Sequence, residues 1–347
     1  MRISHVLVSG AFAGTERYVC EVTAELVRRR HDVVVVGGSP DVMPALLARG
    51  VVWRPGSSPW QVLRSLSLGG RRDIVHTHET KADFVGAVAW VATGGRQVST
   101  RHILAPRGFR PSTQRLARVV RRRIVREVAV SEFVATSLHE SIDDVLVNGL
   151  AVVPEVARIR DSRTVLMAQR LEVEKDTATA VRAWAQSGLG ERGWRLEIAG
   201  AGPEGTALRT LSAQLGVSDS VNFLGWVADM PALYLASAVF LATAPAEPLG
   251  LSVLEAMARA VPVVATDAAG HRETVGRASA PRLFPVGDAQ ACARLLDELT
   301  QDADSRATYG AELRALQRRC FSIEAHVDGL ETIYHRAGGD PAGPSSA

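Results

Sequence analysis

The chain of 347 residues lacks the features that mark disulfide-rich, membrane-spanning or disordered proteins. Its three cysteines, Cys20, Cys292 and Cys320, are too few and too scattered for a disulfide scaffold or a zinc cluster, which favours a reducing compartment. No apolar run reaches the roughly 18 residues that a membrane span requires, and segment 3–8 reads as a first strand, not a signal peptide. The length predicts two domains, and a hydrophobic fraction of 46% is enough to pack their cores. Together with the few cysteines, this predicts a cytoplasmic protein.

Net charge and lysine are also scarce. Forty Lys and Arg residues face 37 Asp and Glu residues, which gives a formal net charge of +3. Such a small excess argues against wholesale binding of nucleic acid. Only Lys81 and Lys175 are lysines, so nearly all positive charge is arginine and the position of Lys175 becomes informative.

Short β-branched segments alternate with helical ones along the whole chain. This alternation predicts an α/β protein with parallel sheets. The polar stretch 158–163 is a candidate linker, and the pattern restarts after it, which predicts two doubly wound halves divided near residue 158. Strands are expected at 3–8, 32–36, 51–53, 74–77, 97–100, 127–130, 145–147, 164–167, 195–198, 220–224, 239–241 and 261–265. Helices are expected at 15–29, 176–187, 204–215, 232–236, 251–258, 289–299 and 322–336.

Ligands bind doubly wound sheets beyond the carboxyl ends of the strands, so the loops that follow strands carry the information. The first such loop, 9–16, is rich in small residues and opens a helix, an arrangement that suits a phosphate. An ordinary turn with Thr15 as the helix N-cap is the alternative. The loop is not G-x-G-x-x-G, which argues against a dinucleotide site.

Two further loops follow strands of the second half. Arg170 and Lys175 follow the strand at 164–167, where two cations could stabilise a diphosphate leaving group; a pair of solvated surface charges is the alternative. The segment Gly200-Ala201-Gly202-Pro203 follows the next strand, and here an ordinary turn is favoured.

The most informative segment runs from Glu247 to Glu255 and places two carboxylates eight residues apart. One lies in a loop after a strand and the other one turn into a helix, with a glycine-containing loop between them. This arrangement can hold a sugar hydroxyl, a phosphate and ribose hydroxyls. The alternatives are an exposed loop acid for Glu247 and, for Glu255, a capping box with Ser252.

With these motifs, the chain resembles the retaining GT-B glycosyltransferases of family 4, over nearly its whole length. The E-x7-E segment, EPLGLSVLEAMARAVPVVATD, carries the resemblance most specifically. The other matching segments follow in the expected order: Gly14-Thr15-Glu16, His76-Thr77-His78, Thr100-Arg101-His102, Val147-Asn148-Gly149, Arg170 to Lys175, Gly200-Ala201-Gly202-Pro203, Phe223-Leu224-Gly225 and the C-terminal Phe321-Ser322 with Ile333-Tyr334.

The resemblance implies a role for each matching residue. Arg170 and Lys175 would neutralise the leaving diphosphate, and Glu247 would contact the donor sugar. His102 would act on the donor sugar from the N-terminal domain. The remaining candidates are substrate-binding: Gly14 at the diphosphate, the backbone of Leu249, Gly250 and Leu251 beside the sugar, Glu255 on the ribose hydroxyls, and Gly200.

Several positions depart from the family pattern. Ala13, Gln169, Asp176 and Ala260 stand where glycine is usual, and Thr243-Ala244 stands where Pro-Ser is usual. No charged catalytic group is lost, so the departures affect expected donor preference more than the reaction. His76 and His78 share one face of a strand, but no carboxylate or cysteine cluster completes a metal site around them. We interpret them as structural or acceptor-side residues.

A basic stretch lies in the expected acceptor domain. Its arginines surround a helical segment with an apolar stripe, for which a solvated basic face is the favoured interpretation. Peripheral contact with anionic lipid at the inner membrane face, or a phosphorylated acceptor, is the alternative. The arginines are Arg107, Arg110, Arg115, Arg118, Arg121, Arg122, Arg123 and Arg126, and the stripe is Leu116, Val119, Val120 and Ile124.

The sequence thus predicts a GT-B fold and transfer of a sugar from a nucleotide-diphosphate sugar to an unidentified hydroxyl acceptor, with retention. UDP is the expected nucleotide, and neither a cofactor nor a metal ion is expected. Expected domains are 1–157 for the acceptor and 158–318 for the donor, then a returning helix at 319–337 and a disordered tail at 338–347. A silent nucleotide-sugar-binding protein and an NAD-dependent oxidoreductase remain as alternatives, the second disfavoured by the missing G-x-G-x-x-G.

Overall fold

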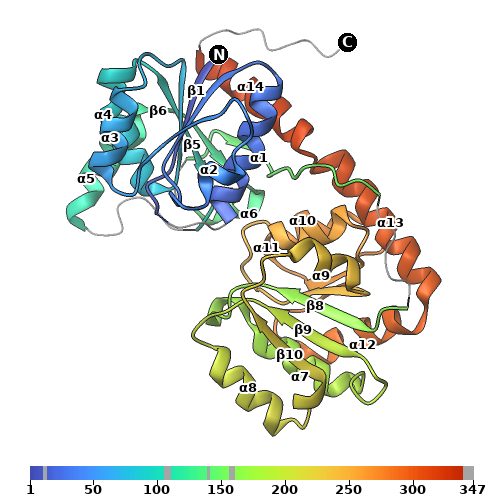
Figure 1. Cartoon of the computed structure of the whole chain (residues 1–347). Helices are drawn as coiled ribbons and strands as arrows, with labels where there is room; N and C mark the ends of the chain where they lie inside the picture. The colour runs from blue at the N-terminus through green and yellow to red at the C-terminus, as the bar shows by residue number, and fades with distance from the viewer. Residues whose placement is uncertain (11–13, 105–110, 139–140, 156–160, 339–347) are drawn as a thin grey trace. The chain divides into compact units, whose positions relative to one another are not determined.

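The computed structural model describes residues 1–10, 14–104, 111–138, 141–155 and 161–338 (Figure 1). Contacts divide the chain into two compact units. Unit 1 comprises Met1–Ala151 and Ser322–Ala347, and unit 2 comprises Val152–Phe321. The sequence predicts this division at 157–158 and the start of the returning segment at 319. Most of the expected disordered tail and part of the expected linker lie outside the described residues.

Unit 1 contains a seven-stranded sheet in the order β3-β2-β1-β4-β5-β6-β7, in which every recorded pairing is parallel. Its strands are β1 (Arg2–Val6), β2 (Asp32–Val36), β3 (Val52–Arg54), β4 (Ile74–His78), β5 (Arg96–Arg101), β6 (Ile124–Ala129) and β7 (Asp144–Val145). Its helices are α1 (Gly14–Arg28), α2 (Met43–Leu46), α3 (Pro59–Ser67), α4 (Thr80–Thr93), α5 (Pro111–Arg123), α6 (Glu132–Ser137) and α14 (Ile323–Gly338).

Helices cover both faces of this sheet, because its strands are apolar on each side. Alternate residues of β1 separate the faces: Ile3 packs in the cluster formed with α1 and α14, whereas Val6 packs in the cluster formed with α3 and α4. Figure 1 shows α3 and α4 on one side of the sheet and α1 and α14 on the other. Strand periodicity puts His5 and His76 on the face covered by α1 and α14.

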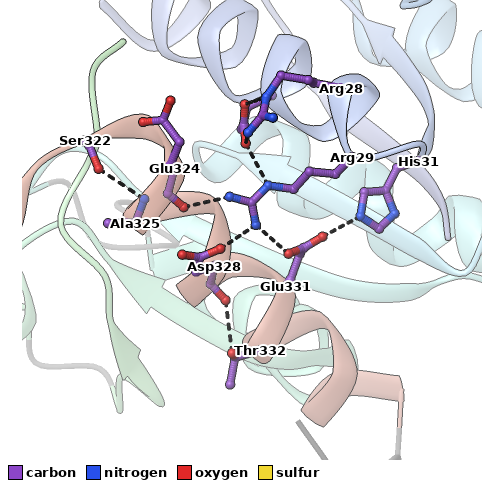
Figure 2. A network of polar contacts seen from close by, with 10 residues as sticks. Arg28, Arg29, His31, Ser322, Glu324, Ala325, Asp328, Glu331 and Thr332 are labelled. Atoms are coloured by element: carbon purple, nitrogen blue, oxygen red, sulfur yellow. Dashed lines mark hydrogen bonds and ion pairs between the residues drawn. The ribbon is translucent and has the colours of Figure 1, made fainter. Parts of the chain in front are cut away.

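A network of ion pairs holds α14 to the end of α1 (Figure 2). Arg29 Nε donates to Glu25 at 2.7 Å, and Arg29 NH1 donates to Glu331 at 2.7 Å. His31 Nε2 lies 2.6 Å from the other carboxylate oxygen of Glu331, and Arg29 NH2 donates to the carbonyl of Glu324 at 2.9 Å. The guanidinium of Arg29 therefore fixes the position of α14, which carries side chains into the core beneath the sheet.

Unit 2 contains a six-stranded parallel sheet in the order β10-β9-β8-β11-β12-β13. Its strands are β8 (Thr164–Ala168), β9 (Arg195–Ala199), β10 (Val221–Gly225), β11 (Val239–Ala242), β12 (Val263–Thr266) and β13 (Leu283–Phe284). Its α-helices are α7 (Thr177–Ser187), α8 (Gly205–Gln214), α9 (Met230–Ala236), α10 (Leu251–Ala258), α11 (Ala269–Glu273), α12 (Ala289–Gln301) and α13 (Ala303–Cys320), and its 3-10 turns are η1 (Val173–Lys175), η2 (Ser218–Ser220) and η3 (Val275–Arg277).

Helices also cover both faces of the sheet in unit 2. Figure 1 shows α7, α8 and α12 on one side and α9 and α10 on the other. The central strands β8 and β11 are therefore buried, and their side chains are almost wholly apolar. Among the described residues, no helix is both long enough and apolar enough to cross a membrane.

Candidate functional site

Each sheet reverses its strand order once, and the candidate residues lie at these two reversals. In unit 1 the order reverses between β1 and β4, and in unit 2 between β8 and β11. Loops after the two strands diverge at such a point, which opens a crevice for a ligand. The loop after β8 carries Arg170 and Lys175, and the loop after β11 carries Glu247.

In unit 2 the structure brings Lys175 and Glu247 together. Lys175 ends η1, and its Nζ lies 2.6 Å from Glu247 Oε2. The two side chains are 16% and 21% exposed, so the pair is partly shielded from water and is held more firmly than a surface ion pair. An ammonium has three donors, so Nζ retains capacity for an anion beside Glu247.

The backbone of Lys175 is held by two of the residues that depart from the family pattern. Gln169 Nε2 donates to the carbonyl of Lys175 at 3.1 Å and to Thr177 Oγ1 at 2.8 Å. Thr243 Oγ1, from the loop after β11, donates to the same Lys175 carbonyl at 3.1 Å. A glycine at position 169 could make neither of the two hydrogen bonds that the Gln169 side chain donates. These two departures therefore fix the loop that presents Lys175.

Arg170 is placed differently from Lys175. Its guanidinium contacts Glu172 and lies 3.3 Å from Glu174, both in its own loop, and its side chain is 62% exposed. A surface pair of this kind has little energetic weight and can be exchanged for a ligand. Of the two cations expected at the leaving group, Lys175 contacts Glu247, whereas the recorded contacts of Arg170 are with Glu172 and Glu174.

Helix α10 begins differently from the capping box considered above. Its N-cap is Gly250, with φ of 93°, and the cap has no side-chain hydrogen bond. Ser252 lies inside the first turn, so the capping-box interpretation of Ser252 and Glu255 is wrong. A left-handed φ suits glycine and turns the chain sharply into the helix. The first N–H groups of α10, near Leu251, therefore point out of the helix beside Glu247 and its loop.

Glu255 lies one turn into α10 and is buried, with 8% of its surface exposed. Leu249 is also buried, and its backbone approaches Gly270 so closely that a Cβ at position 270 would lie 2.4 Å from Leu249 Cα. Gly270 N donates to the carbonyl of Glu247 at 2.9 Å. The loop from Glu247 to Gly250 is thus fixed by contacts with Gly270 in the first turn of α11.

Gly200 and Gly202 serve close backbone packing. A Cβ at Gly200 would lie 1.9 Å from the carbonyl oxygen of Gln169, and one at Gly202 would lie 2.3 Å from that of Leu171. Gly200 also has φ of 137°, which side chains rarely adopt. These contacts place the loop after β9 against the loop that carries Arg170, and they agree with the turn interpretation made from the sequence.

The structure adds one residue to this region, His271, on α11. Thr266 Oγ1 donates to the carbonyl of Ala244 at 2.7 Å, so it accepts from His271 Nδ1 at 2.8 Å. Burial lowers the pKa of His271 to about 4, so the ring is neutral and its Nε2 is an acceptor. Glu247 and Lys175 both act on this pKa, which places them near the ring. A histidine five residues after a strand gives little signal in sequence.

In unit 1, Gly14 is the exposed first residue of α1. Thr15 lies inside the helix, so the interpretation of Thr15 as N-cap is wrong. Ala13 lies outside the described residues. His102 follows β5 and is half-buried, and its Nε2 lies 3.1 Å from His78 Nδ1. The side chain is therefore anchored to the neighbouring strand β4.

His76 and His78 have a partner that the sequence did not reveal. In register, His5 of β1 lies opposite His76 of β4. His5, His76 and His78 are buried, and their ligand atoms lie within 4.8 Å of one another, a group that could hold a metal ion. Pairing between β1 and β4 is needed to see this third imidazole, because residues 7–73 separate the two strands in sequence.

Two acidic residues lie near this cluster. Glu79 directly follows His78 and has φ of 75°, a left-handed conformation that is strained for a residue with a side chain. Burial, followed by the charge of Glu16, raises the pKa of Glu79. This strained residue lies where β4 ends and α4 begins, at the point where the sheet of unit 1 reverses.

The basic stretch around α5 is only partly a free surface. Arg121 pairs with Glu127 at 2.8 Å and Arg126 pairs with Asp144 at 2.9 Å, so these two arginines serve packing. Arg107 and Arg110 lie outside the described residues. The expected stripe divides, since Val120 and Ile124 are buried whereas Leu116 and Val119 are exposed. Beside them, Arg123 lies over the exposed ring of Trp90 at 4.6 Å from its centroid.

Two doubly wound parallel sheets of this kind define the GT-B class of proteins. HepE of Anabaena, solved with UDP-glucose, superposes with a TM-score of 0.80 over 96% of this chain and 99% of its own, at 22% identity. Two family models match as well, "Glycosyltransferase Family 4" over residues 12–149 and "Glycosyl transferases group 1" over residues 153–315. The chain belongs to the GT-B glycosyltransferases of family 4.

Curated bacterial proteins also match parts of the chain. An exopolysaccharide phosphotransferase of Streptomyces coelicolor is 32% identical over 52% of this chain and 20% of its own length. A phosphatidyl-myo-inositol mannosyltransferase of Mycolicibacterium smegmatis is 28% identical over 83% of this chain and 76% of its own length. The chain spans 20% to 39% of the length of the first curated relatives that it matches.

Proposed function

We propose that the protein transfers a sugar, with retention, from a nucleotide-diphosphate sugar to an acceptor hydroxyl. The observation that carries this proposal is the Lys175–Glu247 pair beside the N-terminus of α10, at the point where the sheet of unit 2 reverses. Cation, carboxylate and helix N-terminus together suit a sugar joined to a diphosphate. UDP, present in the HepE structures, is the nucleotide we propose for this chain.

The proposed chemistry is a front-face substitution. As the bond from the sugar carbon to the diphosphate breaks, the leaving phosphate oxygen takes the proton of the acceptor hydroxyl, and the acceptor oxygen bonds to the same face of the carbon. Lys175, Arg170 and the N–H groups at the start of α10 stabilise the growing negative charge. Glu247 stabilises positive charge at the sugar carbon, so its contribution is largest in the transition state.

The remaining residues bind parts of the substrates that do not react. Glu255 accepts hydrogen bonds from the ribose hydroxyls, and Gly14 lies at the diphosphate. His102 of unit 1 contacts the donor sugar. Glu79 and its neighbours after β4 form the acceptor side, for which the envelope glycans and natural products named for the relatives give the class of hydroxyl compound to test.

A transfer assay tests this proposal. The protein is given UDP-, GDP-, ADP- and dTDP-sugars with polyol, glycan and lipid acceptors. We expect turnover with one nucleotide series, and a kcat for Glu247→Gln that is lower by roughly 10²-fold, about 2.7 kcal/mol. Glu191→Gln, an exposed carboxylate in the turn before β9, is the control and stays near wild type. Nucleotide binding without turnover on any acceptor supports the silent binding protein instead.

Metal independence is part of the same proposal. The diphosphate charge is assigned to Lys175, Arg170 and a helix N-terminus, so no divalent cation is required at the leaving group. Turnover is expected to survive EDTA. Loss of activity with EDTA, and its return with magnesium or manganese, would show that a metal ion supplies this charge.

We also propose peripheral contact between unit 1 and anionic membranes. The surface that would dock is formed by exposed apolar and basic residues of α4 and α5, namely Trp90, Val91, Leu116, Arg118, Val119, Arg122 and Arg123. Apolar side chains flanked by arginines suit the interface of an anionic bilayer. We expect co-sedimentation with anionic vesicles and not with neutral ones, and weaker binding by Arg118→Glu/Arg122→Glu than by the control Arg195→Glu of unit 2. Equal recovery with both vesicle types contradicts the proposal.

A further inference from the structure

Five of the nine histidines lie together in unit 1, on the sheet face covered by α1 and α14. Their rings contact one another at centroid separations of 4.4 to 5.3 Å, or contact the ring of Tyr18. Four of them, His5, His76, His78 and His326, are buried, and the fifth, His102, is half-buried. The transfer chemistry proposed above uses only His102 of this set, and so much buried imidazole needs an explanation.

The first half of the cluster is a run of hydrogen bonds from β5 to α14. Thr100 Oγ1 lies 2.7 Å from His76 Nε2, and His76 Nδ1 lies 2.7 Å from the hydroxyl of Tyr334. That hydroxyl lies 3.4 Å from His5 Nε2. Tyr334 belongs to α14, whose position is fixed by the ion-pair network in Figure 2.

The second half of the run leads from β1 to the edge of the core. His5 Nδ1 lies 3.0 Å from His78 Nε2, and His78 Nδ1 lies 3.1 Å from His102 Nε2. One continuous chain of hydrogen bonds thus joins Thr100 to His102. We call it the imidazole chain, and its members are Thr100, His76, Tyr334, His5, His78 and His102.

The imidazole chain has a direction if its rings are neutral. A neutral imidazole has one N–H donor and one acceptor nitrogen. Each interior ring is bonded through both nitrogens, so each must donate at one side and accept at the other. The hydroxyl of Tyr334 has one proton, so it donates to one of its two histidine partners and accepts from the other. Only two arrangements of the whole chain satisfy every bond, and they differ in which nitrogen of His102 carries its proton.

Burial keeps the rings neutral. Burial lowers the pKa of His5 to about 3, and burial with the neighbouring histidines lowers the pKa values of His76 and His78 well below the usual range. Burial, His326 and Arg101 lower the pKa of His102 to about 3. Near neutral pH each ring therefore has one proton to place.

His326 shows how this core fixes a tautomer. Its Nδ1 lies 2.7 Å from the carbonyl of Val147, which can only accept, so Nδ1 carries the proton. The hydroxyl of Tyr18 then donates to Nε2 at 2.8 Å. Tyr18 and His326 make a second, separate hydrogen-bonded pair, which serves as an internal comparison for the imidazole chain.

A bound metal ion is the competing use of three clustered histidines. Nitrogens bound to one zinc ion lie about 3.4 Å apart, from Zn–N bonds of about 2.1 Å in tetrahedral geometry. All six ring nitrogens of His5, His76 and His78 already have partners in the imidazole chain. A metal ion would have to replace several of these bonds, so the observed contacts favour the chain.

We propose that the imidazole chain selects the tautomer of His102, and that Thr100, His76, Tyr334, His5 and His78 are positioning residues that act through it. This inference rests on the proposed function, in which His102 contacts the donor sugar. Because His102 Nε2 is committed to His78, Nδ1 is the nitrogen that can contact a ligand. The direction of the chain decides whether Nδ1 donates to a sugar hydroxyl or accepts from one.

Tyr334→Phe tests the proposal by breaking the chain between His76 and His5 without touching His102. Nitrogen-15 NMR of histidine-labelled protein reports which ring nitrogen of His102 carries the proton. We expect one tautomer in the wild type and a mixture in Tyr334→Phe. Tyr18→Phe is the matched control, because it removes a buried tyrosine hydroxyl from the same core but leaves the imidazole chain intact. It should retain the wild-type spectrum of His102.

Thr100 provides a second test that does not depend on α14. Thr100→Val removes the terminal hydroxyl at nearly constant shape, whereas Thr100→Ser keeps it. The valine variant should show mixed tautomers of His102, and the serine variant should restore the wild-type tautomer. A residue that served packing alone would give the opposite order, since valine fills the space of threonine better than serine does.

Kinetics separates this inference from the proposed function. In each variant, kcat/KM for the donor should fall in proportion to the fraction of His102 that leaves the wild-type tautomer. Affinity for bare UDP should not change, because UDP lacks the transferred sugar that His102 would contact. If the tautomer of His102 changed but kcat/KM did not, the imidazole chain would be supported and the proposed role of His102 in transfer would be wrong. An unchanged tautomer in both Tyr334→Phe and Thr100→Val, or metal-bound resonances for His5, His76 and His78, would overturn the inference.

Discussion

The two units share one fold and place their polar side chains differently. Both sheets are parallel, and both reverse at a central pair of strands. In unit 1 the face of the central strands that packs against α1 and α14 carries neutral imidazoles and hydroxyls, as in His5 and His76. In unit 2 the corresponding loops carry charge, as in Lys175 and Glu247. Charge suits a diphosphate, whereas neutral groups with fixed proton positions suit the hydroxyls of a sugar.

Low pH should give the largest difference in stability between the two units. Below about pH 6.5 an unfolded chain protonates its histidines. In the folded protein, burial lowers the pKa to about 3 or 4 for His5, His102, His271 and His326, and well below the usual range for His76 and His78. These rings therefore stay neutral, and stability falls as pH decreases. Each such ring contributes about 1.4 kcal/mol per pH unit in this range. Unit 1 has five of these histidines and unit 2 has His271 alone.

We therefore expect unit 1 to unfold first, near pH 5, with unit 2 still folded. Hydrogen exchange read by mass spectrometry at stepped pH follows peptides of each unit separately. His326→Gln should reduce the slope of unfolding free energy against pH for unit 1 by about one proton. The slope for unit 2 should not change. Simultaneous unfolding of both units with one slope would contradict the assignment of neutral rings to unit 1.

The loop that presents Lys175 should show a moderate effect. Gln169→Ala removes two hydrogen bonds and Thr243→Val removes one, each worth about 1 kcal/mol. Both donate to one carbonyl, so the double variant should be non-additive. We expect kcat/KM for the donor to fall roughly tenfold in Gln169→Ala. Gln214→Ala, on exposed α8, is the control; an equal loss there would show that the loop bonds do not matter.

Two departures with left-handed backbone should give the smallest effects, one stabilising and one near neutral. Ala260 has φ of 56° and no compensating bond through its methyl group, so Ala260→Gly should stabilise unit 2 by about 0.5–1 kcal/mol. Asp176 has φ of 47° but caps α7, accepting from Thr179 N and Oγ1. Asp176→Gly should therefore be near neutral, because the lost cap offsets the relieved strain.

Denaturant unfolding of unit 2 measures both changes. Ala213→Gly, in exposed α8 with ordinary helical backbone, is the reference and should destabilise by about 0.5–1 kcal/mol. If Ala260→Gly destabilised as much as Ala213→Gly, the left-handed backbone at position 260 would not be a source of strain.

Periodicity and turn residues were enough to predict most of the fold. The strand at 32–36 and the helix at 251–258 have the predicted bounds, and most other elements for which bounds were predicted differ by a few residues. No bounds were predicted for α2, α3, α4, α5, α6, α11 or α13. The misses have physical reasons. Strand β13 has two residues, too short for any alternation, and α13 mixes charged and apolar residues around its circumference with little amphipathic pattern.

The candidate site was only partly visible in sequence. Lys175 and Glu247 were singled out because each follows a strand, and their contact depends on β8 and β11 being neighbours. His5 and Tyr334 were not assigned to the histidine cluster, since strand register and the packing of α14 bring them there. The capping-box prediction was wrong because Gly250, with its left-handed φ, is the N-cap of α10, so Ser252 lies inside the first turn.

Calorimetric titration with bare UDP tests the central claim most directly, that unit 2 holds the nucleotide while Glu247 acts on the sugar. UDP contains ribose but lacks the sugar that is transferred. Glu247→Gln and the unit 1 variant Tyr334→Phe should therefore bind it nearly as the wild type does. Glu255→Gln should weaken binding by the roughly 1.5–3 kcal/mol of charged hydrogen bonds, about 10- to 100-fold. If Glu247→Gln abolished UDP binding and Glu255→Gln left it unchanged, the placement of the donor would be wrong.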